Sequence, residues 1–182
     1  MPPRIYLTGF MASGKSTVGP LLADALGYRF VDLDWLVEAQ TGMSIPDLFA
    51  KGERAFRSAE RRALEETVGG VGSIVSTGGG TLVDPEAFAV ARAAGPVVWL
   101  RASVDTVLDR IGTGEGRPML RGIWGRPLRG EKLRQRVMTL LALREPFYAQ
   151  ADLAVDASAP AEVVAREIAE ALPGWQRQPP GG

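Results

Sequence analysis

The chain has 182 residues, enough for one domain with a sheet covered on both faces. Its 21 basic and 21 acidic residues give a formal net charge of zero, so no overall field favours nucleic acid or an anionic membrane. The absence of cysteine and histidine excludes thiol nucleophiles, Ser-His triads and zinc sites built from these residues, and it favours carboxylate, Lys or Tyr bases and oxygen-bound Mg²⁺.

Neither the start nor the interior of the chain indicates a membrane location. The first residues run directly into an apolar stretch, so we expect no signal peptide. No apolar stretch approaches the length of about 20 residues that a spanning helix needs. These features predict a cytoplasmic protein that binds neither membranes nor nucleic acid.

The first recognisable element is a phosphate-binding loop. Residues 9–17 match the pattern G-x-x-x-x-G-K-S/T between an apolar strand and a helical stretch at 18–26, which is the setting that the motif requires. Backbone N–H groups of such a loop surround phosphate, Lys15 reaches the outer phosphates and the Ser16 hydroxyl is placed for Mg²⁺. The alternative is a glycine-rich turn that happens to precede a helix. The loop residues that we expect to contact a nucleotide are Ala12, Ser13, Gly14, Lys15, Ser16 and Thr17.

Two carboxylates follow the second predicted strand. Alternation along a strand would place Asp32 and Asp34 on the same side, about 7 Å apart. Beside a phosphate-binding loop, one can hold Mg²⁺ through water while the other orients or deprotonates a substrate hydroxyl. As the alternative, Asp34 caps a helix that begins at Trp35.

Two further features have both a structural and a functional interpretation. Arg57 lies in the helical stretch 53–68, where Glu53 and Glu60 are spaced to pair with it, and this pairing alone would explain an arginine on a solvated face. The triple glycine at 78–80 follows the third strand, where it can bring backbone N–H groups close to an anion or form an ordinary turn.

The segment 112–130 has neither helical nor strand periodicity. It contains four arginines, so we interpret it as a lid that closes over phosphates, with a solvated arginine-rich loop as the alternative. These arginines are Arg117, Arg121, Arg126 and Arg129. The residues after it are expected to complete a single domain at 1–172, followed by a disordered tail at 173–182.

Apolar stretches alternate with amphipathic ones along the whole chain. The predicted strands are 4–8, 29–32, 73–77, 96–101 and 152–156. Between them, Ser44, Asp84 and Ser103 are placed to cap helices, and Gly95 is placed to end one. This alternation predicts an α/β fold with a parallel sheet between helices and ligands at the carboxyl ends of the strands.

Taken together, these residues resemble the shikimate kinase family over nearly the whole chain. The resemblance rests on six motifs: the phosphate-binding loop, Asp32-x-Asp34, Phe56-Arg57-x-x-Glu60, the triple glycine, Arg117-Pro118 and Arg144-x-x-x-Tyr148. The second, third and fourth of these, in this order and spacing, are far more specific than the loop alone, while the lid is longer than is usual in the family. It implies a three-layer αβα fold like that of the nucleoside monophosphate kinases, with a five-stranded parallel sheet in the order 2-3-1-4-5 and a mobile lid. The implied reaction is ATP-dependent phosphorylation of the 3-hydroxyl of shikimate in aromatic amino-acid biosynthesis, by a monomer.

The resemblance also implies roles for individual residues. Lys15, Asp34 and Arg117 match the catalytic groups, and Ser16 and Asp32 match the groups that hold Mg²⁺. Shikimate would be bound by Asp34, Arg57, Gly79 and Arg144. ATP would be bound by the loop residues, Arg110 and Arg117. Arg126 is the alternative lid arginine, because Gly-Arg-Pro occurs twice.

Four other interpretations are weaker. A gluconate kinase shares the loop and the fold, but Asp32-x-Asp34 with Arg57 and Arg144 is better matched to a ring substrate. A nucleoside monophosphate kinase would need a base-recognition pocket that we do not identify. A P-loop GTPase switch needs Asn-Lys-x-Asp, which a chain without asparagine cannot contain, and a non-catalytic ATP-binding regulator should have lost Lys15, Asp34 or the lid arginine.

Overall fold

The computed structural model describes residues 2, 4–69, 72–111, 120 and 126–173. Within them, five parallel strands form one sheet in the order β2-β3-β1-β4-β5, which confirms the predicted order. The strands are β1 (Arg4–Thr8), β2 (Arg29–Asp32), β3 (Ser73–Ser76), β4 (Val97–Arg101) and β5 (Leu153–Asp156). Predicted and observed strand ends differ by one residue at most.

Helices connect successive strands. Their bounds are α1 (Lys15–Leu26), α2 (Leu33–Thr41), α3 (Ile45–Lys51), α4 (Glu53–Thr67), α5 (Pro85–Ala94), α6 (Val104–Ile111), α7 (Gly130–Tyr148) and α8 (Ala161–Ala171), with a short 3₁₀ helix η1 (Thr81–Val83). The predicted caps are confirmed. The side chains of Ser44, Asp84 and Ser103 accept hydrogen bonds from backbone N–H groups in the first turns of α3, α5 and α6.

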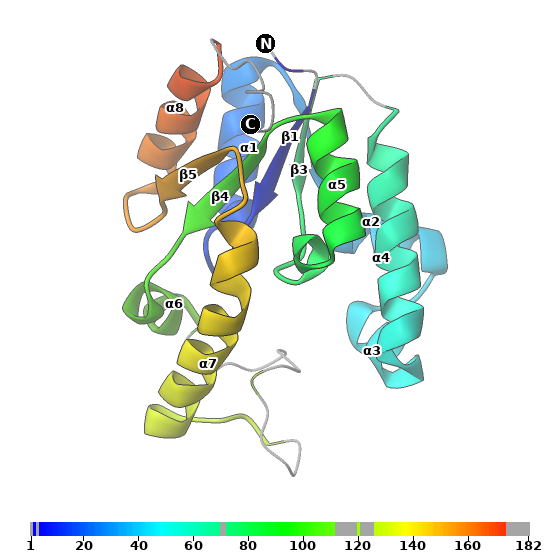
Figure 1. Ribbon diagram of the computed structural model, residues 1–182, viewed down its shortest axis with the longest axis vertical. Helices are drawn as coiled ribbons and strands as arrows, with labels where there is room; N and C mark the ends of the chain where they lie inside the picture. The colour runs from blue at the N-terminus through cyan, green and yellow to red at the C-terminus, as the bar shows by residue number, and fades with distance from the viewer. Residues whose placement is uncertain (1, 3, 70–71, 112–119, 121–125, 174–182) are drawn as a thin grey trace, which may run out of the picture.

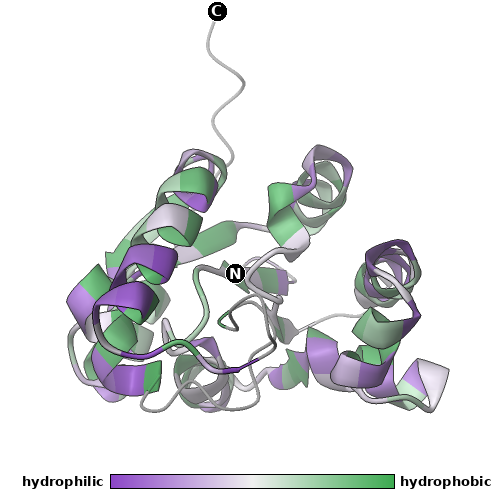
Figure 2. Cartoon of the chain, turned by 90° about the horizontal axis from the view of Figure 1, so that it is seen from below, coloured by the Kyte–Doolittle hydropathy of each residue, from purple (hydrophilic) through white to green (hydrophobic). Residues whose placement is uncertain are grey.

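The sheet separates two hydrophobic cores, because strand residues point alternately to its two faces. Ile5 and Leu7 of β1 face the core formed with α1, α6, α7 and α8, whereas Tyr6 faces the core formed with α2, α4 and α5. Figure 1 shows the resulting three layers. Seen from below in Figure 2, individual helices carry both hydrophobic and hydrophilic residues, as expected for helices that bury one side against a sheet.

The carboxyl ends of the strands face a region flanked by helices from both layers. In Figure 1 the arrowheads of β1 and β4 point toward the lower part of the view, where α3, α6 and α7 lie. This is the edge of the sheet at which parallel α/β proteins bind their ligands.

Parts of two predicted segments fall outside the described residues. In the proposed lid, Arg117 and Arg121 lie there, while Arg126 and Arg129 precede α7 in the described part. The predicted tail lies there from residue 174. Among the helices that the structure describes, none is long and apolar enough to cross a membrane.

Close backbone packing at Gly95 generates a prediction about stability. A Cβ atom at Gly95, at the end of α5, would lie 2.3 Å from the carbonyl oxygen of Arg4 at the start of β1. The backbone cannot give way as a flexible side chain could, so we expect Gly95→Ala to cost about 1–3 kcal/mol in the free energy of unfolding. Thermal unfolding should then begin several degrees lower, by roughly 2–4 °C per kcal/mol for a chain of this size.

Gly69→Ala is the matched control, because a Cβ atom built there meets no heavy atom within 4 Å. Its melting temperature should equal or slightly exceed that of the wild type. Equal melting temperatures for the two variants would contradict the packing argument.

Candidate active site

The phosphate-binding loop connects β1 to α1 in a conformation that requires glycine at two positions. Gly9 has φ +141° and packs so closely on β4 that a Cβ atom would lie 2.6 Å from the carbonyl oxygen of Leu100. Gly14 has φ +99° and precedes the first residue of α1. Because α1 begins at Lys15, its unpaired first-turn N–H groups lie at the loop, where they attract anions.

Lys15 lies inside the loop instead of extending into solvent. Its Nζ atom donates hydrogen bonds to the carbonyl oxygens of Gly9 at 2.8 Å and Phe10 at 3.0 Å, and to Ser13 Oγ at 3.3 Å. Only 9% of the residue is exposed. The ammonium group is therefore held at the centre of the loop, where a bound phosphate would be in reach.

A pocket of about 580 Å³ opens above this loop. All six loop residues predicted to bind nucleotide line it, and so do Asp32, Asp34, Gly79 and Arg110. Arg110, in α6, donates hydrogen bonds to the carbonyl oxygens of Ser13 at 3.2 Å and Ala157 at 2.6 Å. It thereby connects the phosphate-binding loop to the segment between β5 and α8.

The chain turns into α2 earlier than the sequence predicts. The helix begins at Leu33, and Asp32 is its N-cap: Oδ1 accepts hydrogen bonds from the backbone N–H groups of Asp34 at 3.0 Å and Trp35 at 3.4 Å. The idea that Asp34 is the cap was therefore wrong, and so was the placement of both carboxylates on one side of a strand. Both side chains nevertheless line the same pocket, because the capping turn brings them together.

Asp34 has the most perturbed carboxyl group of this site. Its pKa is raised from the usual 3.8 to about 6, first by desolvation and then by the negative charges of Asp32 and Glu60, while Lys15 acts in the opposite direction. The side chain is open to the pocket and still surrounded closely by protein atoms and carboxylates, which explains why the charged form is disfavoured. At pH 7 most Asp34 side chains remain ionised.

A second, smaller pocket of about 130 Å³ adjoins the first and shares Met11, Asp34, Gly78 and Gly79 with it. The smaller pocket differs from the larger one in having an apolar wall, two arginines and the carboxylate of Glu60. Its further lining residues are Ile45, Phe49, Phe56, Arg57, Glu60, Gly80 and Arg144. Asp34 thus lies where a phosphate-binding cavity meets a cavity suited to an anionic, partly apolar molecule.

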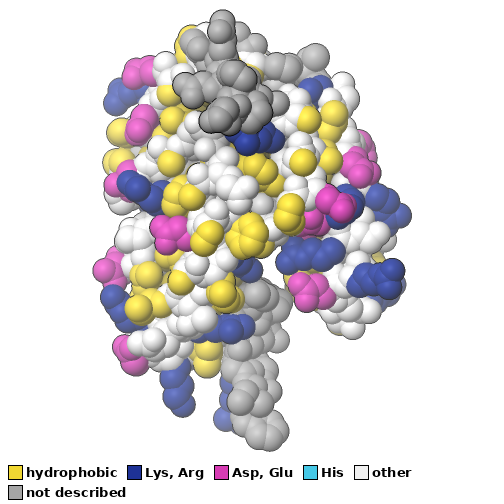
Figure 3. All heavy atoms as spheres, in the orientation of Figure 1, with side chains coloured by type: hydrophobic (Ala, Val, Ile, Leu, Met, Phe, Trp, Pro, Cys, Tyr) yellow, Lys and Arg dark blue, Asp and Glu magenta, His cyan; other side chains and the backbone are white. Residues whose placement is uncertain are grey.

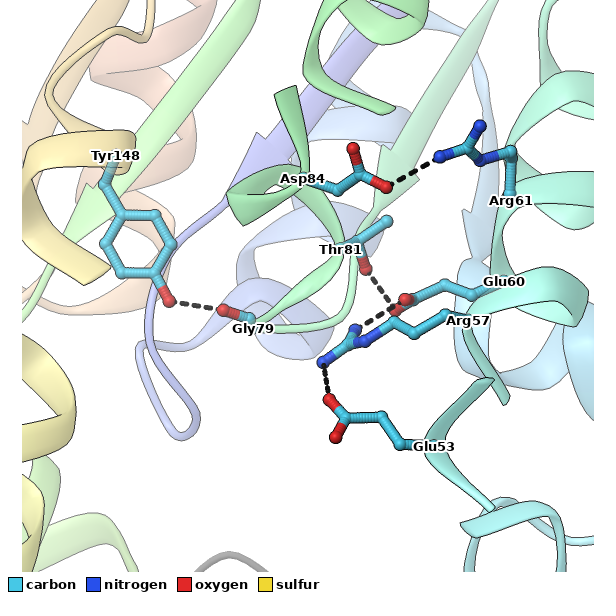
Figure 4. Close-up of polar contacts among 8 residues, drawn as sticks. All are labelled: Glu53, Arg57, Glu60, Arg61, Gly79, Thr81, Asp84 and Tyr148. Atoms are coloured by element: carbon cyan, nitrogen blue, oxygen red, sulfur yellow. Dashed lines mark hydrogen bonds and ion pairs between the residues drawn. The ribbon is translucent and has the colours of Figure 1, made fainter. Parts of the chain in front are cut away.

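Arg57 is fixed by a buried carboxylate (Figure 4). Glu60 Oε2 accepts from Arg57 Nη1 at 2.7 Å, and Glu60 Oε1 accepts from Thr81 Oγ1 at 2.5 Å. Glu53 lies 3.7 Å from Arg57 Nη2, so both predicted pairings are confirmed. Arg57 keeps about a third of its side chain exposed, and it also lines the smaller pocket and packs over the Phe56 ring at 5.2 Å.

Arg144 reaches the same pocket from the opposite layer. Its guanidinium lies 5.5 Å from the centre of the Phe10 ring, and its Nη1 atom would be 3.4 Å from a Cβ atom at Gly79. One turn later in α7, the Tyr148 hydroxyl donates a hydrogen bond to the carbonyl oxygen of Gly79 (Figure 4). Two residues of one helix face therefore contact the triple glycine.

The donor set fits a hard metal ion held by few protein ligands. Ser16 and Asp32 both line the larger pocket, and Asp32 uses only Oδ1 for the helix cap. No group of three or more acidic side chains suited to a metal occurs among the described residues. A hydroxyl and one carboxylate are what Mg²⁺ needs where phosphate oxygens and water complete its coordination.

Thr81 and Phe49 had no place in the sequence-based interpretation, and Tyr148 entered it only through the Arg144-x-x-x-Tyr148 motif, without a role of its own. Phe49 stacks on Phe56 with ring centres 4.2 Å apart, which closes the apolar wall. For Tyr148 a signal existed, since it lies four residues after Arg144 on the same helix face. Nothing local marks Thr81 as the partner of Glu60. The predicted lid arginine, Arg117, lies outside the described residues.

Comparison with known proteins identifies the family of the chain. The chain matches the family model for shikimate kinase over residues 11–173. A shikimate kinase of Chlorobium chlorochromatii is 48% identical over 87% of this chain and 84% of that protein, and one of Salinibacter ruber is 45% identical over 94% and 85%. The structure of a shikimate kinase from Acinetobacter baumannii in complex with shikimate superposes with a TM-score of 0.85 and 32% identity, covering 94% of this chain and 93% of that one. The chain therefore belongs to the shikimate kinase family.

Proposed function

We propose that this kinase transfers the γ-phosphoryl group of ATP to the 3-hydroxyl of shikimate at the junction of the two pockets. The observation that carries the proposal is the shared wall of Asp34, Gly78 and Gly79, which places a carboxylate with a raised pKa between a phosphate-binding loop and an arginine-lined cavity. A relative of similar structure has been solved with shikimate.

On the nucleotide side, residues 12–17 and the first turn of α1 bind the phosphates of ATP. Lys15 exchanges its hydrogen bonds to loop carbonyls for bonds to the β- and γ-phosphate oxygens. Arg110 stays beside the loop and contacts the nucleotide, and Arg117 of the lid approaches the γ-phosphate. The charge of these cations offsets the negative charge of the transferring group.

Ser16 and Asp32 would hold Mg²⁺, with Asp32 acting through water. The bound ion would supply positive charge to the phosphate groups of ATP, beside the N–H groups of the loop. Asp32 has a second task, since its Oδ1 atom fixes the backbone at Asp34. One residue thus positions both the metal and the neighbouring carboxylate.

On the acceptor side, Arg57 and Arg144 bind the carboxylate of shikimate together with the backbone at Gly79. A guanidinium presents two parallel donors to a carboxylate, and two such groups orient the ring. Asp34 binds the reacting hydroxyl and accepts its proton as phosphoryl transfer proceeds. Glu60 acts on Arg57 and does not contact the substrate.

We also propose that the protein acts as a monomer in the cytoplasm. Large exposed hydrophobic side chains of the described residues are spread over separate helices, such as Trp35 in α2, Leu143 in α7 and Val163 in α8. On the face shown in Figure 3, hydrophobic side chains are interspersed with charged ones. An extended apolar patch would instead indicate an interface.

Because Arg57 is assigned to the carboxylate of the acceptor, its removal should weaken the binding of shikimate and not that of ATP. ADP release from Mg-ATP should require shikimate, with no turnover of gluconate, quinate or nucleoside monophosphates. Arg57→Ala should raise the KM for shikimate by about 10- to 100-fold, the equivalent of about 1.5–3 kcal/mol for a charged hydrogen bond, and leave the KM for ATP unchanged.

Arg61→Ala is the matched control for this variant. Arg61 lies one turn later in α4, has a similar side-chain exposure (41% against 34%) and pairs with Asp84 and Glu86 outside both pockets. It should keep wild-type kinetics. An equal rise in both KM values for Arg57→Ala would contradict the carboxylate assignment.

The raised pKa of Asp34 predicts a pH dependence. The carboxyl group must lose its proton to act as a base, so kcat/KM for shikimate should fall as the pH drops below about 6, toward tenfold per pH unit. Because phosphate groups of ATP titrate in the same range, the Asp34 side-chain carbon should also be followed by NMR in the free protein, where its midpoint should lie near pH 6.

Asp34→Asn should lose at least about 100-fold in kcat and still bind Mg-ATP, because the amide keeps the shape and loses the base. A midpoint near pH 4 in the NMR titration, or near-normal turnover by the variant, would refute the assigned role.

Asp32 caps α2 and is also proposed to hold Mg²⁺, so substitutions there should change stability and Mg²⁺ dependence separately. Asp32→Asn keeps an oxygen for the α2 cap, so its melting temperature should stay close to that of the wild type while the Mg²⁺ concentration for half-maximal activity rises several-fold. Asp32→Ala should lose about 1 kcal/mol of stability in addition. Asp84→Ala, which removes the cap of α5, should lose stability without any change in Mg²⁺ dependence.

A further inference from the structure

Tyr148 is buried where its hydroxyl bonds to the triple glycine and also interacts with the Arg144 side chain. It is the last residue of α7, it is 1% exposed, and its ring packs 6.0 Å from the Trp99 ring of β4. Its hydroxyl donates to the carbonyl oxygen of Gly79, 69 positions away in the chain. Burial raises the pKa of Tyr148 to about 12, so the hydroxyl remains a donor at any physiological pH.

The hydrogen bond fixes the middle of an otherwise flexible loop. The carbonyl oxygens of Gly78 and Gly80 accept from Thr81 and Val83 within the same turn, at 3.2 and 3.3 Å. The carbonyl of Gly79 is held only from outside the turn, by Tyr148. Consecutive glycines have the largest backbone freedom of any residues, so a fixed orientation here depends on such an external bond.

The direction of one N–H group follows from this bond. No cis peptide occurs among the described residues, and in a trans peptide the C=O and N–H groups point in opposite directions. Since the Gly79 carbonyl points at Tyr148, the N–H of Gly80 points away from it, toward the side where Arg57 lies (Figure 4). Gly80 is close to that side chain, because a Cβ atom there would be 2.9 Å from Arg57 Nη2.

The N–H of Gly80 has no partner of its own within the described part of the chain. It lies in the wall of the smaller pocket, beside the two arginines. A backbone donor held next to two guanidinium groups forms a site for a carboxylate.

We propose that Tyr148 is a positioning residue for the acceptor substrate: it holds the Gly79–Gly80 peptide so that the Gly80 N–H donates a third hydrogen bond to the carboxylate that Arg57 and Arg144 bind. This role rests on the proposed function of the two arginines. Tyr148 itself touches no substrate, and its effect is specific to the acceptor because Gly80, whose N–H it orients, lines the smaller pocket and not the larger one.

Tyr148→Phe tests the role, since it removes the hydroxyl and keeps the ring that packs on Trp99. The KM for shikimate should rise about 5- to 10-fold, as expected for one hydrogen bond. The KM for ATP should stay within a factor of about two and kcat should change less than the KM for shikimate. A purely structural role would lower stability without this split between the substrates. Loss of the contact with Arg144 alone would give the same split, so the amide resonance of Gly80 decides between the two causes: the shift that shikimate induces in the wild type should be lost or much reduced in Tyr148→Phe, and an unchanged shift would overturn the proposal.

Tyr6→Phe is the matched control. The Tyr6 hydroxyl is also buried and bonded, to Thr67 Oγ1 at 3.0 Å, but it belongs to the core between the sheet and α4 and lines neither pocket. It should lose a similar amount of stability and keep wild-type kinetics. A KM for shikimate that is unchanged in Tyr148→Phe, or raised equally with that for ATP, would overturn the proposal.

A second measurement needs no variant. In the wild-type protein, the amide resonance of Gly80 should shift when shikimate is added, because the carboxylate becomes its acceptor. No shift at saturating shikimate would overturn the proposal. Failure of the wild type to phosphorylate shikimate would overturn the proposed function instead, so the two failures are distinguishable.

Discussion

The site depends on one constraint: other groups of the chain approach the backbone closely at Gly78, Gly79 and Gly80. A Cβ atom at Gly78 would lie 3.0 Å from Glu60 Oε1 and 3.3 Å from Asp34 Oδ1, and one at Gly80 would lie 2.9 Å from Arg57 Nη2. At Gly79 it would lie 3.3 Å from the backbone nitrogen of Met11 in the phosphate-binding loop. The missing side chains let the loop after β3 lie between the two pockets as a thin wall, so that groups on either side of it are close enough to act on one reaction.

The proposed reaction also requires a base that works near neutral pH, in a chain without histidine. The fold meets it by crowding carboxylates: Asp32 and Glu60 lie near Asp34, and their charges together with desolvation raise its pKa to about 6. The positive charge of Lys15 acts in the opposite direction and limits that rise in the pKa. Each neighbour also has its own bonded task, Asp32 as a helix cap and Glu60 as the partner of Arg57 and Thr81, so the electrostatic effect follows from groups that the structure needs for geometry.

The cations of the site are held in place by the protein itself. Lys15 and Arg110 both donate to backbone carbonyls of the phosphate-binding loop, and Arg57 is bonded to buried Glu60. Side chains that are already ordered lose less conformational entropy when a ligand binds. The local concentration of positive charge explains how a chain with no net charge can bind two anionic substrates.

Sequence alone determined the features whose physical cause is local. The phosphate-binding loop, the capping side chains of Ser44 and Asp84, and the pairing of Arg57 with Glu60 all depend on residues a few positions apart, and alternating strands and helices predicted the layered sheet. Tertiary structure decided where those features meet. It joined Thr81 to Glu60 across 21 positions, brought Tyr148 to Gly79 across 69 and brought Arg110 to the phosphate-binding loop across 97. Such contacts leave no periodic signal in the sequence, because they are fixed only when the parallel strands bring distant loops to one edge of the sheet.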